Sequence, residues 1–203
     1  MKRLFTALTL AACCTMAQAE SESEFYKAGQ EKSALCAGCH NADGNSLVPM
    51  FPKLAELDAG YIARQLKAFR AGERQDPVMA PMATALTDED IRDIAAYYSA
   101  QKRTLDLPAA PPEIVAKGEK LFWGGQGSSV PACAGCHGAR GDGMPQAGYP
   151  YLRGQHADYL AKQLRDFKSG VRNNDAAKMM RITTARMTDE EIDAVAQYIS
   201  GLE

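Results

Sequence analysis

The pentapeptide Cys-Ala-Gly-Cys-His occurs twice in the chain, at residues 36–40 and again at residues 133–137. This C-x-x-C-H pattern is typical of c-type haem attachment. The two cysteine thiols can form thioethers with the vinyl groups of a haem, and the histidine beside them can bind the iron. Two identical copies predict two covalently bound haem c groups. The attaching cysteines would be Cys36, Cys39, Cys133 and Cys136, and the first axial ligands would be His40 and His137.

A C-x-x-C pair has alternative uses. It can be half of a zinc site or a thioredoxin-like redox dithiol. Zinc needs four ligands, but the chain has three histidines and two of them lie inside the motifs. A thioredoxin-like pair is expected at a strand-to-helix turn, and no alternating strand pattern flanks either copy. The sequence therefore favours haem over these two alternatives.

The N-terminus has the features of an export signal. Two basic residues precede an apolar run over residues 4–14, and Ala17-Gln18-Ala19 matches a small-residue cleavage site. We therefore expect a signal peptide over residues 1–19 and a periplasmic protein. The same stretch also resembles a lipoprotein signal, in which a lipid on Cys13 would give peripheral membrane association.

Cysteine usage and charge narrow the class of protein further. Of six cysteines, two lie in the predicted signal peptide and the other four all belong to the haem motifs. No thiol then remains for a disulfide. The formal net charge is −2, and no basic stripe indicates nucleic-acid binding.

The surroundings of the two motifs repeat as well, which indicates a duplication. Phe51-Pro52-Lys53-Leu54 matches Tyr149-Pro150-Tyr151-Leu152, and residues 86–91 match residues 187–192. We expect a first domain over residues 20–103, a Pro-rich linker over 104–112 and a second domain over 113–203.

Both repeats have the pattern of helices, so the predicted fold class is all-α. Apolar residues recur at helical spacing over residues 61–69 and 159–167. Capping boxes that begin at Thr87 and Thr188 predict the last helix of each repeat. Each domain is expected to close its helices around one haem.

The repeat also selects the second axial ligand of each iron. Soluble electron carriers of this kind usually add a methionine thioether. Only Met79 and Met180 lie eight residues before the threonine that starts the last helix of their repeat. We predict that Met79 completes the iron site of His40 and that Met180 completes the site of His137.

Several other residues have roles that the sequence leaves open. His156 is a rival axial ligand, but its repeat partner is Asp58, so a helix cap or a bond to a haem propionate is the expected role. Tyr61 and Tyr159 are expected to pack or to bond to propionates, and Trp123 to pack on haem or fill the core.

A carbonyl that accepts the second ring N–H of each histidine is also expected, because such a bond orients a ligating imidazole. Pro49, nine residues after His40, is the candidate in the first repeat. Ala147 holds the matching position in the second.

Together, the two C-A-G-C-H motifs, the paired methionines, the T-D-E helices and the G-Q-H at residues 154–156 resemble cytochrome c4. That resemblance implies two tandem class I cytochrome c domains in a pseudo-twofold arrangement, with the propionate edges facing across the interface. One departure is Asp58-Ala59, where the family tends to have Gly-Gln, so the resemblance implies no propionate contact at these two residues.

The resemblance also implies a non-enzymatic, monomeric electron carrier. It would accept electrons from a quinol-cytochrome c reductase or another donor and pass them to a terminal oxidase, commonly of the cbb3 type. The alternative is a dihaem subunit of a larger dehydrogenase, such as a flavocytochrome sulfide dehydrogenase. A dihaem peroxidase and a gas sensor both need an iron with an open position, which two axial pairs would close.

Overall fold

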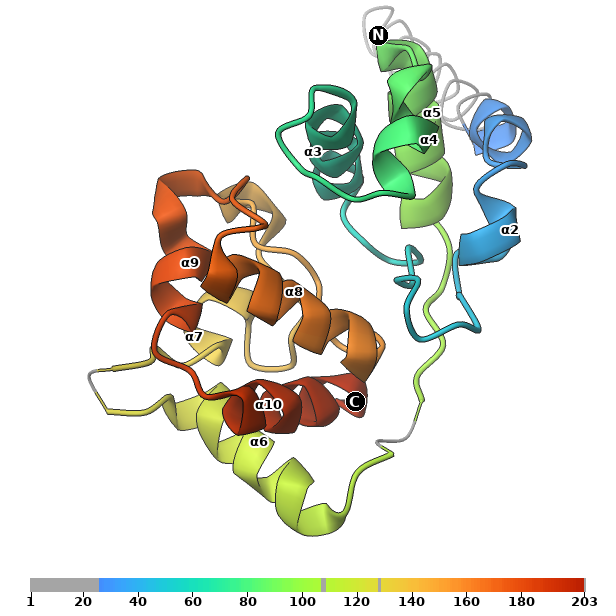
Figure 1. Cartoon of the computed structure of the whole chain (residues 1–203). Helices are drawn as coiled ribbons and strands as arrows, with labels where there is room; N and C mark the ends of the chain where they lie inside the picture. The colour runs from blue at the N-terminus through green and yellow to red at the C-terminus, as the bar shows by residue number, and fades with distance from the viewer. Residues whose placement is uncertain (1–25, 107–108, 128, 203) are drawn as a thin grey trace, which may run out of the picture.

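The computed structural model describes residues 26–106, 109–127 and 129–202. The predicted signal peptide and Cys13 lie outside this range. Figure 1 shows two helical lobes joined by one extended segment. The described residues contain no β-strand, and their only β-type pairings are the isolated bridges Gln126–Val130 and Met144–Tyr149. The all-α prediction is confirmed.

The first lobe consists of the helices that precede the extended segment in the chain. Its helices are residues 26–32, α2 (Ala37–His40), α3 (Ala59–Arg70), α4 (Met79–Thr84) and α5 (Asp88–Ser99). Helix α3 packs against both α4 and α5. Its buried residues Ile62 and Leu66 meet Ile91, Ile94 and Tyr98 of α5 in one apolar core.

The second lobe repeats this arrangement. Its elements are α6 (Pro112–Gly124), α7 (Ala134–His137), η1 (Pro145–Ala147), α8 (Ala157–Ser169), η2 (Ala176–Lys178), α9 (Met179–Thr184) and α10 (Asp189–Ser200). Helix α10 packs against α6 and α8. The buried side chains of Phe122, Leu160, Ile192 and Val195 belong to its core.

The predicted capping boxes form at the start of both terminal helices. The Thr87 hydroxyl accepts the backbone N–H of Asp90, whose carboxylate accepts the backbone N–H of Thr87 in return. Thr188 and Glu191 make the same reciprocal pair in α10. Because each box satisfies two otherwise unpaired N–H groups, it fixes where the last helix begins.

A glycine lies at each crossing of the first and last helices. A Cβ added to Gly29 would lie 2.1 Å from the carbonyl oxygen of Asp93, and one added to Gly118 would lie 2.0 Å from that of Ala194. Real Cβ atoms do not approach this closely, so only glycine lets the backbones meet.

The two lobes are tied together by buried hydrogen bonds. The Gln155 side chain accepts the backbone N–H of Lys53 at 2.8 Å and donates to the Lys53 carbonyl at 2.9 Å. The buried Lys53 ammonium reaches Thr104 and Asp106, in the segment predicted as the linker.

No helix in the described part of the chain is long and apolar enough to cross a membrane.

Candidate haem sites

His40 ends the short helix α2 and points its ring back at the following loop. Its Nδ1 lies 2.9 Å from the carbonyl oxygen of Pro52. His137, at the end of α7, repeats this contact with the carbonyl oxygen of Pro150 at 3.0 Å. Both histidines are buried, with 4% and 6% of their surface exposed.

These carbonyls are not the expected ones, so the sequence expectation of Pro49 and Ala147 was wrong. The backbone turns between Val48 and Phe51, where the Phe51 N–H donates to the Val48 carbonyl. Pro52, which follows this turn, is therefore the residue whose carbonyl lies next to the His40 ring. One signal in the sequence was available: proline occupies the matched position in both repeats at Pro52 and Pro150, but not at Pro49 and Ala147.

The proline contacts decide which ring nitrogen is free. A carbonyl oxygen can only accept, so Nδ1 of each histidine donates and Nε2 keeps its lone pair for a metal. Burial lowers the pKa of both His40 and His137, while the bonds to the proline carbonyls act in the opposite direction. Each ring is therefore held neutral and oriented, as an iron ligand must be.

The cysteines sit in the turns that lead into these histidines. Burial raises the pKa of the Cys36 thiol, and it raises the pKa of the Cys133 thiol to about 11. A thioredoxin-like nucleophile needs the opposite shift. No group of three or more His, Cys, Asp or Glu side chains in the described part of the chain could hold a metal ion. The raised thiol pKa values therefore argue against the dithiol alternative.

The two selected methionines lie in the first turns of two short helices that correspond in the repeat. Met79 is the first residue of α4, and Met180 lies in the first turn of α9. Both are partly buried. Met79 packs against the same apolar core as Cys36. By contrast, Met179 is 43% exposed, and Met187 is buried in the core of the second lobe.

The register of these helices supports the pairing of Met79 with Met180. Ala83 and Thr184 stand at the same distance after the two methionines, and both side chains are completely buried. In the first lobe, the Asp76 carboxylate accepts the backbone N–H groups of Val78 and Met79 and so anchors the start of α4.

The residues present fit a covalent haem. Each lobe offers two thiols in one turn, a neutral imidazole with a free Nε2 and a thioether on a separate helix. Nitrogen and thioether sulfur are the axial donors of c-type electron carriers. These ligand assignments stay predictions, which the geometry supports.

The residues with open roles have other partners in the structure. His156 is the N-cap residue of α8, but its side chain does not cap; its Nε2 lies 2.8 Å from the carbonyl oxygen of Ser46 in the first lobe. Asp58 does cap α3, by accepting the Tyr61 N–H. Trp123 is half exposed and donates to the Tyr198 hydroxyl.

Comparison with known proteins agrees with this architecture. The cytochrome c family model matches residues 26–101 and 115–203. The chain is 46% identical over 177 residues to cytochrome c4 of Pseudomonas aeruginosa, covering 86% of this chain and 87% of that one. It is 42% identical to cytochrome c4 of Stutzerimonas stutzeri over the full length of both chains.

Solved structures give the same result. The reduced cytochrome c4 from Pseudomonas stutzeri superimposes with a TM-score of 0.84 at 43% identity, covering 88% of this chain and 98% of that chain. The chain is also 37% identical over 199 residues to a protein named thiosulfate dehydrogenase electron acceptor, from Stutzerimonas stutzeri strain A1501. That match covers 92% of this chain and 88% of its relative.

Two helical lobes, each with its own C-x-x-C-H turn, define a dihaem c-type cytochrome, whose cofactors are two covalently bound haem c groups. The chain belongs to the cytochrome c family and, within it, to the cytochromes c4. It is accordingly an electron-transfer protein.

Proposed function

We propose that this protein is a periplasmic single-electron carrier in which each haem iron has both of its axial positions occupied by side chains of the protein. His40 and Met79 would hold one iron, and His137 and Met180 the other. When bound, each haem supplies one reversible electron. The observation that carries the proposal is the repetition, in both lobes, of a proline-oriented histidine and an in-register methionine.

The protein's own residues have a simple task in this function. They keep both axial positions filled and the ligands in one orientation, so that the iron changes charge with little rearrangement. The histidines are locked by the proline carbonyls, and Met79 is held at the start of α4 by Asp76. An iron closed on both sides has no place for a substrate, which is consistent with a carrier rather than an enzyme.

Methionine variants test the ligand assignment. Met79→Ala and Met180→Ala should each remove about half of the weak near-infrared band that reports methionine bound to ferric haem. Each variant should also let the reduced protein bind about one carbon monoxide per chain. Met179→Ala is the matched control, because Met179 is the exposed neighbour on α9. An unchanged band in Met79→Ala or Met180→Ala would remove that residue from the account.

Export and the downstream partner belong to the same proposal. The signal-like residues 1–19 support a periplasmic location, with a lipid on Cys13 as the alternative. The acceptor would be a terminal oxidase, of the cbb3 type, and the donor a quinol-cytochrome c reductase. Oxidation of the reduced protein by membranes that contain such an oxidase, and not by membranes that lack it, tests the acceptor.

A second candidate is an electron-accepting partner of a dehydrogenase. The relative named thiosulfate dehydrogenase electron acceptor favours it. So does the thiosulfate dehydrogenase TsdBA structure from Marichromatium purpuratum, which matches at 33% identity and a TM-score of 0.78, over 86% of this chain and 40% of that one. Reduction of the protein by thiosulfate in the presence of a purified thiosulfate dehydrogenase, at a rate that competes with its oxidase reaction, would favour this role.

A further inference from the structure

Two buried hydroxyl groups in the first lobe have no hydrogen-bond partner in the described part of the chain. They belong to Ser33, three residues before Cys36, and to Tyr98 of α5, and these two residues are 2% and 0% exposed. Buried polar atoms are paired in the great majority of native structures, and an unpaired one lowers stability. Two such hydroxyls in one lobe therefore need an explanation.

Both hydroxyls lie close to the residue that is expected to attach the first haem. The apolar core that contains Tyr98 also contacts Cys36 and Met79. Burial raises the pKa of the Tyr98 phenol, the Cys36 thiol adds to that rise, and the Ser33 hydroxyl opposes it. Each of these influences weakens with distance, so the phenol lies near both side chains. Haem attachment converts the thiol into a thioether and leaves the phenol beside the haem.

The second lobe has hydrocarbon at both matching positions. Val130 also lies three residues before the first cysteine of its motif, and Ile199 corresponds to Tyr98 in the repeat. Val130 and Ile199 are 2% and 3% exposed, and both belong to the core against which Cys133 packs. The surroundings of the first attaching cysteine are therefore polar in one lobe and apolar in the other.

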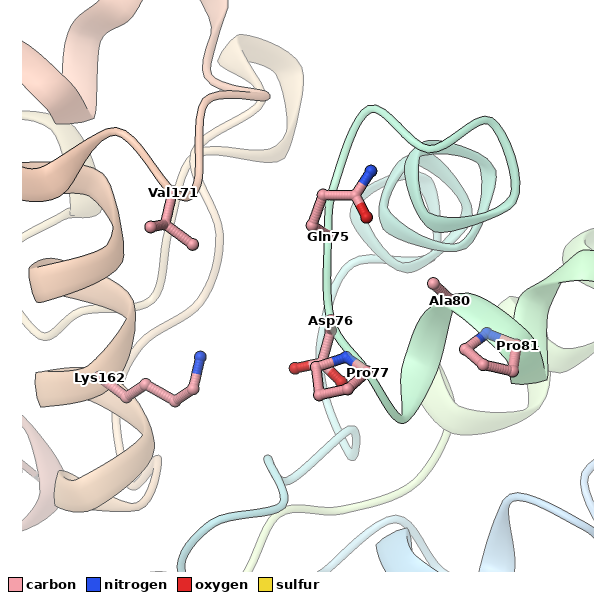
Figure 2. A pocket seen from close by; sticks show the side chains of 7 residues that line it. All are labelled: Gln75, Asp76, Pro77, Ala80, Pro81, Lys162 and Val171. Carbon is pink, nitrogen blue, oxygen red and sulfur yellow. The ribbon is translucent and has the colours of Figure 1, made fainter.

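The two hydroxyls have neither a pocket nor an ion to interact with. The pocket of about 460 Å³ that opens between the lobes is lined by other residues, among them Asp76 and Lys162 (Figure 2). The buried carboxylate of Asp93, also on α5, is already paired with the Lys32 ammonium at 2.6 Å. Ser33 and Tyr98 therefore contribute two neutral dipoles whose O–H directions no partner fixes.

Such dipoles respond to the charge of the iron. A hydroxyl without a fixed partner orients in the local field, and oxidation adds one positive charge to the haem. The hydroxyl oxygens can turn toward this charge and stabilise it, whereas the hydrocarbon of Val130 and Ile199 cannot. We propose that the hydroxyls of Tyr98 and Ser33 lower the reduction potential of the first haem and leave that of the second unchanged. This inference rests on the two-haem electron carrier proposed above.

Redox titration of the holoprotein, with each haem followed by the NMR signals of its methyl groups, tests the inference. Tyr98→Phe keeps the ring and removes the hydroxyl. It should shift the ferrous-to-ferric ratio of the first haem about threefold toward ferrous, equivalent to about 28 mV for a one-electron couple. The second haem should not shift. Ser33→Ala should act on the same haem in the same direction.

Tyr26→Phe is the matched control for this substitution. The Tyr26 hydroxyl also belongs to the first lobe, but the residue is exposed and the hydroxyl accepts a hydrogen bond from Gln101 at 3.0 Å. Its removal should leave both potentials unchanged. A shift as large as that of Tyr98→Phe would show that loss of any tyrosine hydroxyl in this lobe is enough, and would overturn the inference.

Stability distinguishes an unpaired hydroxyl from one with a structural role. Removing an unpaired buried hydroxyl relieves its desolvation penalty, so Tyr98→Phe should raise the guanidinium denaturation midpoint. Tyr97→Phe is the comparison, because the Tyr97 hydroxyl donates to the Ala42 carbonyl at 2.8 Å, and its loss should lower the midpoint. A lower midpoint in Tyr98→Phe together with an unmoved first potential would assign Tyr98 a structural role and refute the proposal.

The second lobe permits the reverse experiment. Val130→Thr replaces one methyl group with a hydroxyl and should lower the potential of the second haem alone. A second potential that stays or rises would contradict the dipole mechanism.

The outcomes separate this inference from the function beneath it. An unmoved first potential in Tyr98→Phe, or an equal shift of both haems, would overturn the inference while an intact near-infrared methionine band leaves the electron carrier standing. A methionine band that is missing from the wild-type protein would instead count against the carrier itself. If Tyr98→Phe does not fold, Ser33→Ala carries the same test.

Discussion

The Nδ1 atom of His40 lies 2.9 Å from the carbonyl oxygen of Pro52, and this contact fixes the ring that would hold the first iron. Donation from Nδ1 makes the imidazole more basic, which favours ferric iron. Pro52→Gly keeps the carbonyl but frees the backbone, so we expect a higher potential for this haem and altered haem-methyl NMR shifts. Pro49→Gly should change neither, and equal effects of the two variants would argue against the contact.

The helix crossing at Gly118 should tolerate no side chain. Gly118→Ala places a Cβ 2.0 Å from the Ala194 carbonyl oxygen, so α6 and α10 must separate. We expect a loss of about 1–3 kcal/mol in the free energy of unfolding, as is typical of overpacking. Guanidinium denaturation of the holoprotein measures it. Gly124→Ala, on the same helix with open space around it, should be neutral or stabilising; a loss as large there would contradict the crossing.

Gln155 should stabilise the contact between the two lobes, because both the oxygen and the nitrogen of its side-chain amide form hydrogen bonds. It pairs with the backbone N–H and carbonyl of Lys53 across the interface and is 3% exposed. Gln155→Ala leaves the buried N–H of Lys53 without its acceptor and leaves the Lys53 carbonyl only the longer bond from Arg103 at 3.4 Å, at a cost of about 2 kcal/mol. Calorimetry should show the two lobes unfolding less cooperatively. Gln75→Ala is the comparison and should unfold like wild type, because the Gln75 side chain is exposed and donates to the nearby Gly72 carbonyl within the same lobe.

His156 should make the interface sensitive to acid. Burial lowers its pKa, with Lys53 and Arg103 acting in the same direction and the Ser46 carbonyl and Asp106 opposing. A lowered folded-state pKa means that the unfolded chain binds more protons below about pH 6.5. Stability should be constant above that pH and fall as the pH drops toward the folded pKa. His156→Gln should flatten this slope, measured as denaturation midpoints from pH 5 to 8; an unchanged slope would contradict it.

Local sequence rules predicted the elements well. The capping boxes at Thr87 and Thr188 start their helices as expected, since a cap depends only on residues three positions apart. The repeat placed Met79 and Met180 in corresponding helices because a duplicated sequence keeps its register. These features need no knowledge of tertiary packing.

The features that the sequence missed all depend on packing between distant segments. The expected side-chain cap by His156 does not form, and its ring instead reaches the carbonyl of Ser46, 110 residues away. Nothing local distinguishes Gly118 from other helical glycines until α10 lies against it. The repeat matches Arg74 with Arg172. It does not show that the Gln65 and Gln163 side chains each accept hydrogen bonds from both arginines, because these bonds form only where the two lobes meet.

Near-infrared magnetic circular dichroism of the fully oxidised protein tests the central claim most directly, because it identifies the axial ligands of ferric haem and counts the centres. The account predicts two low-spin haems per chain, both with histidine and methionine ligation, and no signal from a bis-histidine or water-bound iron. A second centre with any other axial pair would contradict the assignment of His40 with Met79 or of His137 with Met180.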